Sequence, residues 1–449
     1  MKLNASFQAR PYRPRRRITS ERRRPALRRP THGVLLLLVI PFLAGLAGCD
    51  GVADPAPYEE SLEPPGSEPS VPELPRALTE GEAEVLEGSN AFGFDLLQEI
   101  LRETPDSTVF LSPLSASMVL GMTMNGAAGE LWESMRDALR FGNLSQEEIN
   151  ASYRSLTDLL RGLDPAVTFD LANSIWHVTG LTLTEDFRAV TKEVFDAESH
   201  ALEFSAPDAA DVINAWVEEA TRGRIQDMVP SPIPPGIITY LLNATYFQGR
   251  WTDAFEPDST SRGTFHLPDG GEGRADFMTR TGSMLSTSAP LYDAVELPYG
   301  EEEAFAMTIV VPRNEATVAQ VLEELAGGEW HTLVGNLQRR SARILLPRFE
   351  LEWEQVLDDF LDRMGMQFGG DLSPMFGEPG PRIEEVKQKT FVRVDEEGTE
   401  AAAATSVAIG ISGLHEVRAD RPFLLAIRER VSGTVLFLAA IVEPPPPAE

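Results

Sequence analysis

Apolar residues at helical spacing predict four helices along the chain. The predicted helices cover residues 90–101, 113–126 and 355–364 and, within residues 212–229, the stretch that stops near Gly223. Asn90 is a candidate N-cap for the first helix, because it immediately precedes the apolar pattern. Ser112 followed by Pro113 fits an N-cap and the first helical position of the second helix.

Alternating or continuous apolar runs predict strands between and after these helices. The predicted strands cover residues 107–111, 169–178, 237–247, 295–300, 305–312, 342–350 and 386–394. The fourth and fifth are expected to form a hairpin, and residues 248–251 are expected to turn the chain. Helices and strands together predict a mixed fold, which a chain of 449 residues can hold in one large domain.

Residues 394–412, VDEEGTEAAAATSVAIGIS, look like a strand in a place where a loop is expected. Strand side chains alternate between two faces. One face would carry Thr399, Ala401, Ala403, Thr405 and Val407, and the other would carry Glu400, Ala402, Ala404 and Ser406. Such small side chains would allow the segment to enter an existing sheet as an extra strand. Residues 399–412 would then span roughly 45 Å at about 3.3 Å per residue. Composition alone fits a helical turn or a flexible tether equally well.

The N-terminal segment has the features of an export signal. Arginine clusters precede an apolar run from Gly33 to Leu46, which is too short to span a membrane comfortably. The run ends in Leu46-Ala47-Gly48-Cys49, and small residues before a cysteine resemble a bacterial lipobox. Cys49, the only cysteine, is therefore expected to carry lipid and to become the mature N-terminus. Ordinary secretion with a chance cysteine, a twin-arginine signal and an incorrect start codon remain alternatives.

Residues 50–79 are rich in Pro, Glu, Ser and Gly and cannot bury a core, so we expect a disordered spacer. The expected organisation is a signal peptide at 1–48, a lipidated cysteine with its spacer at 49–80, a folded domain at 81–444 and a tail at 445–449. The expected location is therefore outside the cytoplasm, as a membrane-anchored lipoprotein in the periplasm or at the cell surface.

The charge of the exported part excludes a general nucleic-acid binder. The whole chain has 39 basic and 69 acidic residues. Residues 1–48 hold 11 of the basic and one of the acidic residues, which leaves 28 against 68, a net charge of −40. A general nucleic-acid binder needs clustered Lys and Arg side chains to contact the phosphates, and so strong an acidic excess argues against such a surface.

Two segments carry a resemblance to a known family. EEGTEAAAAT, residues 396–405, resembles the proximal hinge of the serpin reactive-centre loop, and residues 419–444 are similar to the C-terminal strands of serpins. The resemblance implies an α+β serpin fold, with about nine helices around three mixed or antiparallel sheets and an exposed reactive-centre loop. It also implies an irreversible suicide-substrate inhibitor of serine, or cysteine, endopeptidases. In such inhibitors the cleaved loop inserts into the central sheet and traps the acyl-enzyme.

The same resemblance assigns roles to three groups of residues. The hinge of the loop comprises Glu396, Gly398, Thr399, Glu400, Ala401, Ala402, Ala403 and Ala404. The shutter beneath the main sheet comprises Ser112, Ser115, Asn243 and Gln388, and the breach, where the loop first enters, contains Trp251. Gln388 stands where many relatives have histidine, so no imidazole titration is expected there. An ion pair between Glu396 and Arg348 is also implied.

The bait bond, the peptide bond that the target protease would cleave, can be located by counting residues in two ways. Sixteen residues on from Glu396, the usual family spacing, gives Ser412-Gly413, whereas counting back from Arg421 gives Ile411-Ser412. No Arg or Lys lies between Arg393 and Arg418, so trypsin-like targets are disfavoured. Elastase-, subtilisin- or chymotrypsin-like proteases fit better, with Leu414 as a further candidate for the last class.

We find no pattern typical of an enzyme. The single cysteine allows no disulfide within the chain, and Ser412 lacks the strand-to-helix context of a nucleophile elbow. His177 has no second ligand-type residue nearby, and no metal or cofactor is expected. The expected partners are a target protease, bound covalently, and a membrane, reached through the lipid; the protein is expected to be a monomer. A non-inhibitory binding lipoprotein of the same fold and an unrelated hydrolase are the alternatives.

Overall fold

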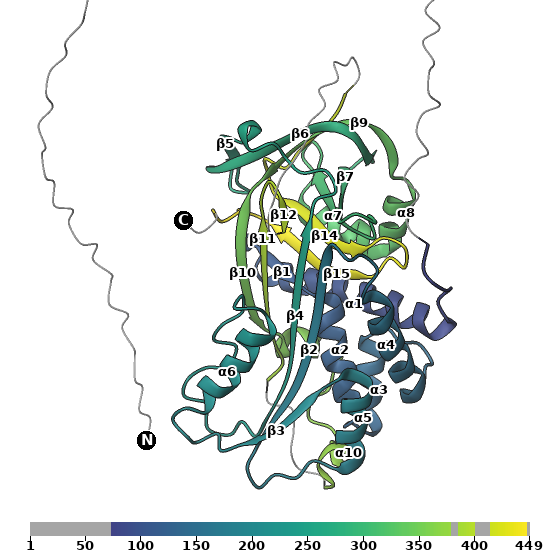
Figure 1. Ribbon diagram of the computed structural model, residues 1–449, viewed down its shortest axis with the longest axis vertical. Coiled ribbons are helices and arrows are strands. Elements are labelled where there is room, and N and C mark those ends of the chain that lie inside the picture. The colour runs from purple at the N-terminus through teal and green to yellow at the C-terminus, as the bar shows by residue number, and fades with distance from the viewer. Residues whose placement is uncertain (1–72, 379–384, 400–413, 447–449) are drawn as a thin grey trace, which may run out of the picture. The chain divides into compact units, whose positions relative to one another are not determined.

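In the computed structural model, residues 73–378, 385–399 and 414–446 are described (Figure 1). Helices surround three sheets in these residues, so the predicted α+β class is confirmed. Several predicted site residues lie outside the described residues: Cys49, Glu400, Ala401, Ala402, Ala403, Ala404, Ile411, Ser412 and Gly413.

The largest sheet has nine strands and holds most of the core. Its order is β1 (Val109–Leu111), β15 (Val435–Ile441), β14 (Phe423–Glu429), β8 (Phe305–Pro312), β7 (Tyr292–Tyr299), β6 (Glu272–Ser288), β9 (Gln338–Pro347) and β13 (His415–Arg418), and β5 (Ser261–His266) also pairs with β6. Strands β8, β14 and β15 are buried along their whole length, as expected for strands covered on both faces. The predicted hairpin is confirmed as β7 and β8.

Two smaller sheets form the other layer. One has the order β12 (Gly398–Thr399), β4 (Thr239–Arg250), β2 (Val167–Val178) and β3 (Glu198–Leu202). The other is an antiparallel pair of β10 (Phe349–Val356) and β11 (Lys387–Val394). Strands β2 and β4 pair from Val167 with Gly249 to His177 with Thr239.

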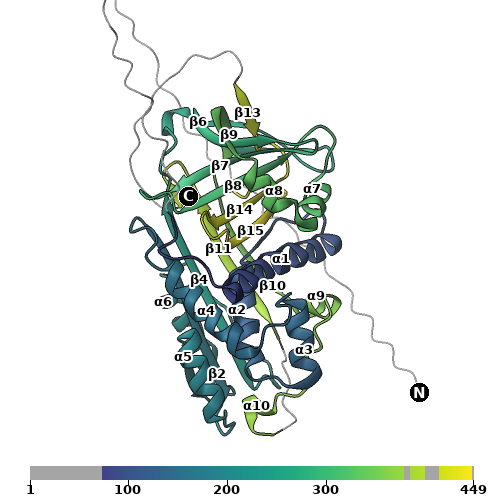
Figure 2. The same ribbon diagram turned by 90° about the vertical axis from the view of Figure 1, so that its right-hand side faces the viewer.

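Helices cover these sheets (Figure 2). They are α1 (Glu80–Glu103), α2 (Pro113–Met124), α3 (Gly129–Ala138), α4 (Gln146–Leu160), α5 (Glu185–Phe195), α6 (Ala209–Ala220), α7 (Val318–Glu324), α8 (Trp330–Gly335), α9 (Asp358–Arg363) and α10 (Ser373–Phe376). Helix α2 is buried almost all round, which fits its nearly uniform apolar sequence. Helix α6 instead buries one face in a separate apolar cluster on the outer side of β2 and β4. No helix among the described residues is both long enough and apolar enough to cross a membrane.

The predicted N-cap at Asn90 is wrong. Helix α1 starts ten residues earlier, where Thr79 and Glu82 form a capping box. The guanidinium of Arg76 beside Glu82 lowers the pKa of that carboxyl to about 2. Asn90 lies inside the helix, where its side chain donates to the carbonyl of Gly433 and accepts from the amide of Val435, both at 2.9 Å. A capping-type residue is thus used here for a tertiary contact.

Two predicted strand ends are also wrong. Residues 342–350 do not form one strand, because the chain leaves β9 at Pro347 and enters β10 at Phe349. Residues 248–251 do not turn the chain, because β4 continues to Arg250 and pairs there with Gly398. The predicted helix 355–364 loses its first residues to β10, where Gln355 pairs with Gln388.

Candidate functional site

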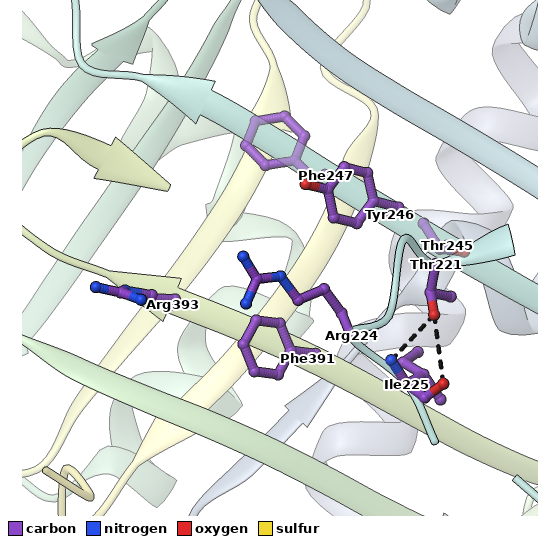
Figure 3. Close-up of a pocket in the computed structure, with 8 residues that line it drawn as sticks. All are labelled: Thr221, Arg224, Ile225, Thr245, Tyr246, Phe247, Phe391 and Arg393. Carbon is purple, nitrogen blue, oxygen red and sulfur yellow. Dashed lines mark hydrogen bonds between the residues drawn. The ribbon is translucent and has the colours of Figure 1, made fainter. Parts of the chain in front are cut away.

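Strands β4 and β11 lie next to each other without a ladder in the described part of the chain. The ladder partners of β4 are β2 and β12, whereas β11 pairs with β10. We call the boundary between β4 and β11 the seam. A pocket on it is lined by residues of β4, of β11 and of the segment after α6, and Figure 3 shows Phe247 and Phe391 facing it from the two strands. Its volume of about 10 Å³ holds at most one water molecule. An added strand could therefore enter only if β4 and β11 moved apart.

Strand β12 already occupies one end of the seam, beside Gly249 and Arg250 of β4. After β11 the chain turns back, and the amide of Asp395 donates to the carbonyl of Gly398 at 3.1 Å. Gly398 and Thr399 then pair antiparallel with Arg250 and Gly249 of β4. Gly398 has φ of 140°, and a Cβ there would lie 2.4 Å from the carbonyl oxygen of Gly249. Only glycine fits this close approach.

Trp251 holds the turn that leads into β12. Its indole nitrogen donates to the carbonyl of Asp395 at 3.0 Å, and its backbone amide donates to the carbonyl of Glu397 at 3.1 Å. The ring is buried and stacks on Tyr299 with centroids 4.4 Å apart. The predicted breach residue therefore lies directly against the base of the loop.

Glu396 is fixed at the base of the loop by two side chains. Thr260 donates to its carboxylate at 2.6 Å, and Arg348 lies 3.9 Å away. The ion pair implied by the family resemblance is therefore present. Arg348 lies closer to Asp276, at 3.1 Å, and is partly exposed, so its pairing with Glu396 contributes at most about 1 kcal/mol.

The N-terminus of α2 contacts the β11 side of the seam through Gln388. The Gln388 side chain accepts from the amide of Ser112 and donates to the carbonyl of the same residue, both at 3.0 Å. Ser112 caps α2 by accepting from the amide of Ser115 and donates to the carbonyl of Leu436 at 2.7 Å. Thr390 adds a hydrogen bond to the carbonyl of Phe110. All of these groups are buried.

The same end of α2 contacts the β4 side through Asn243. Ser115 donates to the Asn243 side-chain oxygen, and the Asn243 nitrogen donates to Asn173 of β2 at 2.8 Å. The structure thus brings together Ser112, Ser115, Asn243 and Gln388, the four residues predicted for the shutter. Strands β4 and β11 are linked through α2 instead of through a ladder of their own.

The segment after α6, residues 221–236, crosses the seam on the opposite face. Lys389 of β11 donates to the carbonyl of Gln226 at 2.5 Å and pairs with Glu352 at 2.6 Å. The guanidinium of Arg224 lies over the ring of Phe391, 5.4 Å from its centroid (Figure 3). Because this segment lies over both strands, any separation of β4 from β11 would require it to move.

Several residues that make contacts in the site were not predicted as site residues from the sequence. They are Asn173, Tyr299, Thr260, Thr390 and Lys389. Asn173 could have been found by an argument like that used for Asn243, since it is a polar residue within a predicted strand and a buried amide must be hydrogen-bonded. The others depend on contacts between distant elements. Among the described residues, no group of three His, Cys, Asp or Glu side chains is placed to hold a metal ion.

Comparisons with known proteins agree with one another. A profile of the family described as Serpin (serine protease inhibitor) matches residues 87–444. An uncharacterized serpin-like protein of Thermococcus kodakarensis is 32% identical over 432 residues, which are 91% of this chain and 98% of that protein. Iripin-3 of Ixodes ricinus is 31% identical over 369 residues, 79% of this chain and 93% of its own length. The crystal structure of human thyroxine-binding globulin with thyroxine has a TM-score of 0.76 at 23% identity and covers 81% of this chain and 100% of its own.

Replacing Gln388 by alanine is expected to lower the free energy of unfolding by about 2–4 kcal/mol, because it leaves the buried amide and carbonyl of Ser112 without this partner. Urea denaturation followed by tryptophan fluorescence measures the change. The matched control is Gln355→Ala on the neighbouring strand, where the side chain is less buried and bonds only to the next residue. Equal effects of the two substitutions would contradict the linking role of Gln388.

Proposed function

Because the chain belongs to the serpin family, whose members generally inhibit proteases, we propose that it is an irreversible inhibitor of serine, or cysteine, endopeptidases. The catalytic serine or thiol of the target attacks a bait carbonyl between Thr399 and His415. The amide bond breaks, the new amine end stays with β13, and the acyl group remains esterified to the protease. The freed N-terminal part of the loop then enters the seam and carries the tethered protease with it.

The single observation that supports this proposal is the seam. In the described residues, β4 and β11 are neighbours without a mutual ladder, so a third strand could pair with both of them once they separated. Strand β12 already makes the first pairs of such a strand. The native state would then be held short of its most stable arrangement by a kinetic barrier.

The register of β12 predicts where each residue of an inserted strand would lie. Continued along β4 and β11, it sets Ala403 opposite Thr245 and Thr390. Residues 399, 401, 403 and 405 would then face α2 and the buried shutter, the face on which the sequence has only Thr and Ala. Residue 400 would lie opposite Gln248 and Arg393, where a charged side chain can reach solvent.

We further propose an exported, lipid-anchored monomer that acts on elastase-, subtilisin- or chymotrypsin-like targets. The sequence at Leu46-Ala47-Gly48-Cys49 supports the anchor, and the bait region without Arg or Lys supports the target class. The proline-rich residues that follow Cys49 would hold the inhibitor away from the membrane surface.

Incubation with pancreatic elastase, followed by a denaturing gel, is expected to give a covalent band at the summed mass of the two proteins. The cleaved inhibitor is expected to melt about 10 °C or more above the intact one. An added strand contributes several kcal/mol to the free energy of unfolding, and each kcal/mol raises Tm by roughly 2–4 °C. Clean cleavage without the band and without the rise in Tm would indicate a non-inhibitory binding protein instead.

Replacing Ala403 by arginine is expected to lower the trapped fraction of protease about tenfold or more, because insertion would bury an unpaired charge beside the shutter. The cleaved product should rise correspondingly on the same gel. Ala403→Ser, which keeps the side chain small, and Glu400→Arg, which places the same charge on the outward face, serve as controls. A stable complex formed as efficiently by the Ala403→Arg protein would contradict insertion in this register.

The Cys49→Ser protein is expected to lose its lipid and to move from the membrane to the soluble fraction. Metabolic labelling with a radioactive fatty acid and membrane fractionation in a bacterial host measure both effects. An unlabelled wild-type protein in the soluble fraction would contradict the anchor while leaving the inhibitory proposal intact.

A further inference from the structure

Strand β9 gathers arginines in a protein that is otherwise strongly acidic. Its ten residues include Arg339, Arg340 and Arg343 and no acidic residue. Outside residues 1–48, by contrast, the chain has 28 basic against 68 acidic residues. Strand β9 is therefore a basic strand in an acidic protein.

Two of these arginines lie on the outer face of β9. Side chains alternate along a strand, and the inner face of β9 is fully buried through Ala342, Ile344 and Leu346. On the other face, the side chain of Arg339 is exposed and makes no hydrogen bond or ion pair within the described residues. The side chain of Arg343 is 42% exposed, and in the same residues its one ion pair is with Glu416, at 3.6 Å. Both guanidinium groups are therefore accessible to a partner.

The outer face around these arginines is rich in hydrogen-bond donors. Across the ladder with β6, Arg343 lies opposite Thr281, and Ser341 lies opposite Ser283. The two β6 residues are exposed. Among the paired residues of β6, β9 and β13 that share this face, Glu416 is the one acid. Guanidinium and hydroxyl groups without bulky neighbours form a surface that suits carboxylates of a partner.

The acidic residues at the β7 end of this face already have cationic partners. Glu296 is buried and pairs with Arg428 and, at 2.9 Å, with Arg430. Glu303 pairs with Arg430 at 3.1 Å. Both carboxylates line a small pocket together with Arg339 but are bound to arginines of their own. The positive charge on β9 is therefore left largely unneutralised.

The basic face lies beside the bait. Strand β13 pairs in parallel with β9, with His415 opposite Ala342 (Figure 2). The two candidate bait bonds lie within four residues before His415. Arg339 lies three residues before Ala342, about 10 Å along the strand at about 3.3 Å per residue. A bound protease covers about 800 Å² of its inhibitor, a circle of about 16 Å radius, so a protease that holds the bait would also cover β9.

We propose that the outer face of β9 is an exosite, a surface outside the bait loop that binds the target protease, and that it favours proteases with an acidic surface beside the active site. This inference rests on the proposed inhibitory function. The Debye length is about 8 Å at physiological ionic strength, so a docking protease interacts mainly with charges near the contact. The overall negative charge of the inhibitor acts over longer distances and is screened. Carboxylates that meet β9 therefore speed docking.

Subtilisin in two charge states tests the exosite. Succinic anhydride converts its lysine amines into carboxylates, so the same enzyme is obtained in a more acidic form. At about 0.15 M salt, succinylated subtilisin is expected to associate about tenfold faster with the wild-type inhibitor than with Arg339→Glu/Arg343→Glu. At about 1 M salt, where the Debye length is about 3 Å, the two rates should agree within about twofold. Arg339→Gln/Arg343→Gln should give a smaller loss, and unmodified subtilisin should distinguish the proteins less.

The matched control is Arg188→Glu/Lys192→Glu on α5, which changes the net charge equally at two exposed positions. Figure 2 shows α5 at the other end of the molecule from β9, so this variant is expected to associate like the wild type. Equal slowing in both charge-reversed proteins would overturn the inference, because net charge alone would then explain it. Association unchanged in the β9 variant would also overturn it. Heparin binding lost from that variant while protease association is unchanged would assign the face to a polyanion instead.

Binding without chemistry separates the exosite from the inhibitory function. Succinylated subtilisin with its catalytic serine replaced by alanine is passed over the immobilised full-length inhibitor. Salt-dependent retention by the wild type, lost in Arg339→Glu/Arg343→Glu, would support the exosite even if active subtilisin formed no covalent complex. That combination would refute the inhibitory function alone. Equal retention by the two proteins would overturn the exosite and leave trapping untouched.

Discussion

The structure depends on hydrogen bonds at one end of helix α2. Ser112 and Ser115 lie at its first turn and reach Gln388 on one side of the seam and Asn243 on the other. Without a ladder between β4 and β11, these buried contacts, together with the segment after α6, keep the two strands side by side. A link made by side chains can be rearranged more readily than a full ladder, because only a few hydrogen bonds must be exchanged for a strand to enter.

The two ends of the loop are held in different ways. At the start, Gly398 packs against the backbone of β4, and Trp251 binds the turn before it through two hydrogen bonds. At the end, β13 is a short edge strand with one fully buried side chain, and its His415 lies 3.1 Å from the hydroxyl of Ser286 and 3.3 Å from the carboxylate of Asp293. The start of the loop therefore lies at the seam, whereas its end lies on the edge of the large sheet.

Much of this arrangement could be predicted from the sequence, because its strongest signals are local. The cap at Ser112 followed by Pro113, the polar Asn243 in an apolar strand and the hairpin of β7 and β8 each follow from a few neighbouring residues. The predictions were wrong where contacts with elements distant in the sequence decide the role of a residue or the end of a strand. Asn90 could cap a helix on local grounds but binds the turn before β15 instead. Strand β4 continues past Phe247 because β2 and β12 both pair with its end. His415 gave no local signal, since its partners come from strands more than a hundred residues away.

The register of β12 also indicates which side chains of an entering strand would meet the polar residues along the seam. Continued along both strands, it sets Thr405 opposite Asn243 and Gln388, the two residues that bind the end of α2. Both of these amide side chains are buried, and neither could lose its present partners without cost. A threonine hydroxyl can donate and accept at once, so it can compensate hydrogen bonds that an alanine at the same position would leave broken. The run of alanines thus gives way to a hydroxyl at the level where an entering strand would meet the polar link that holds the seam closed.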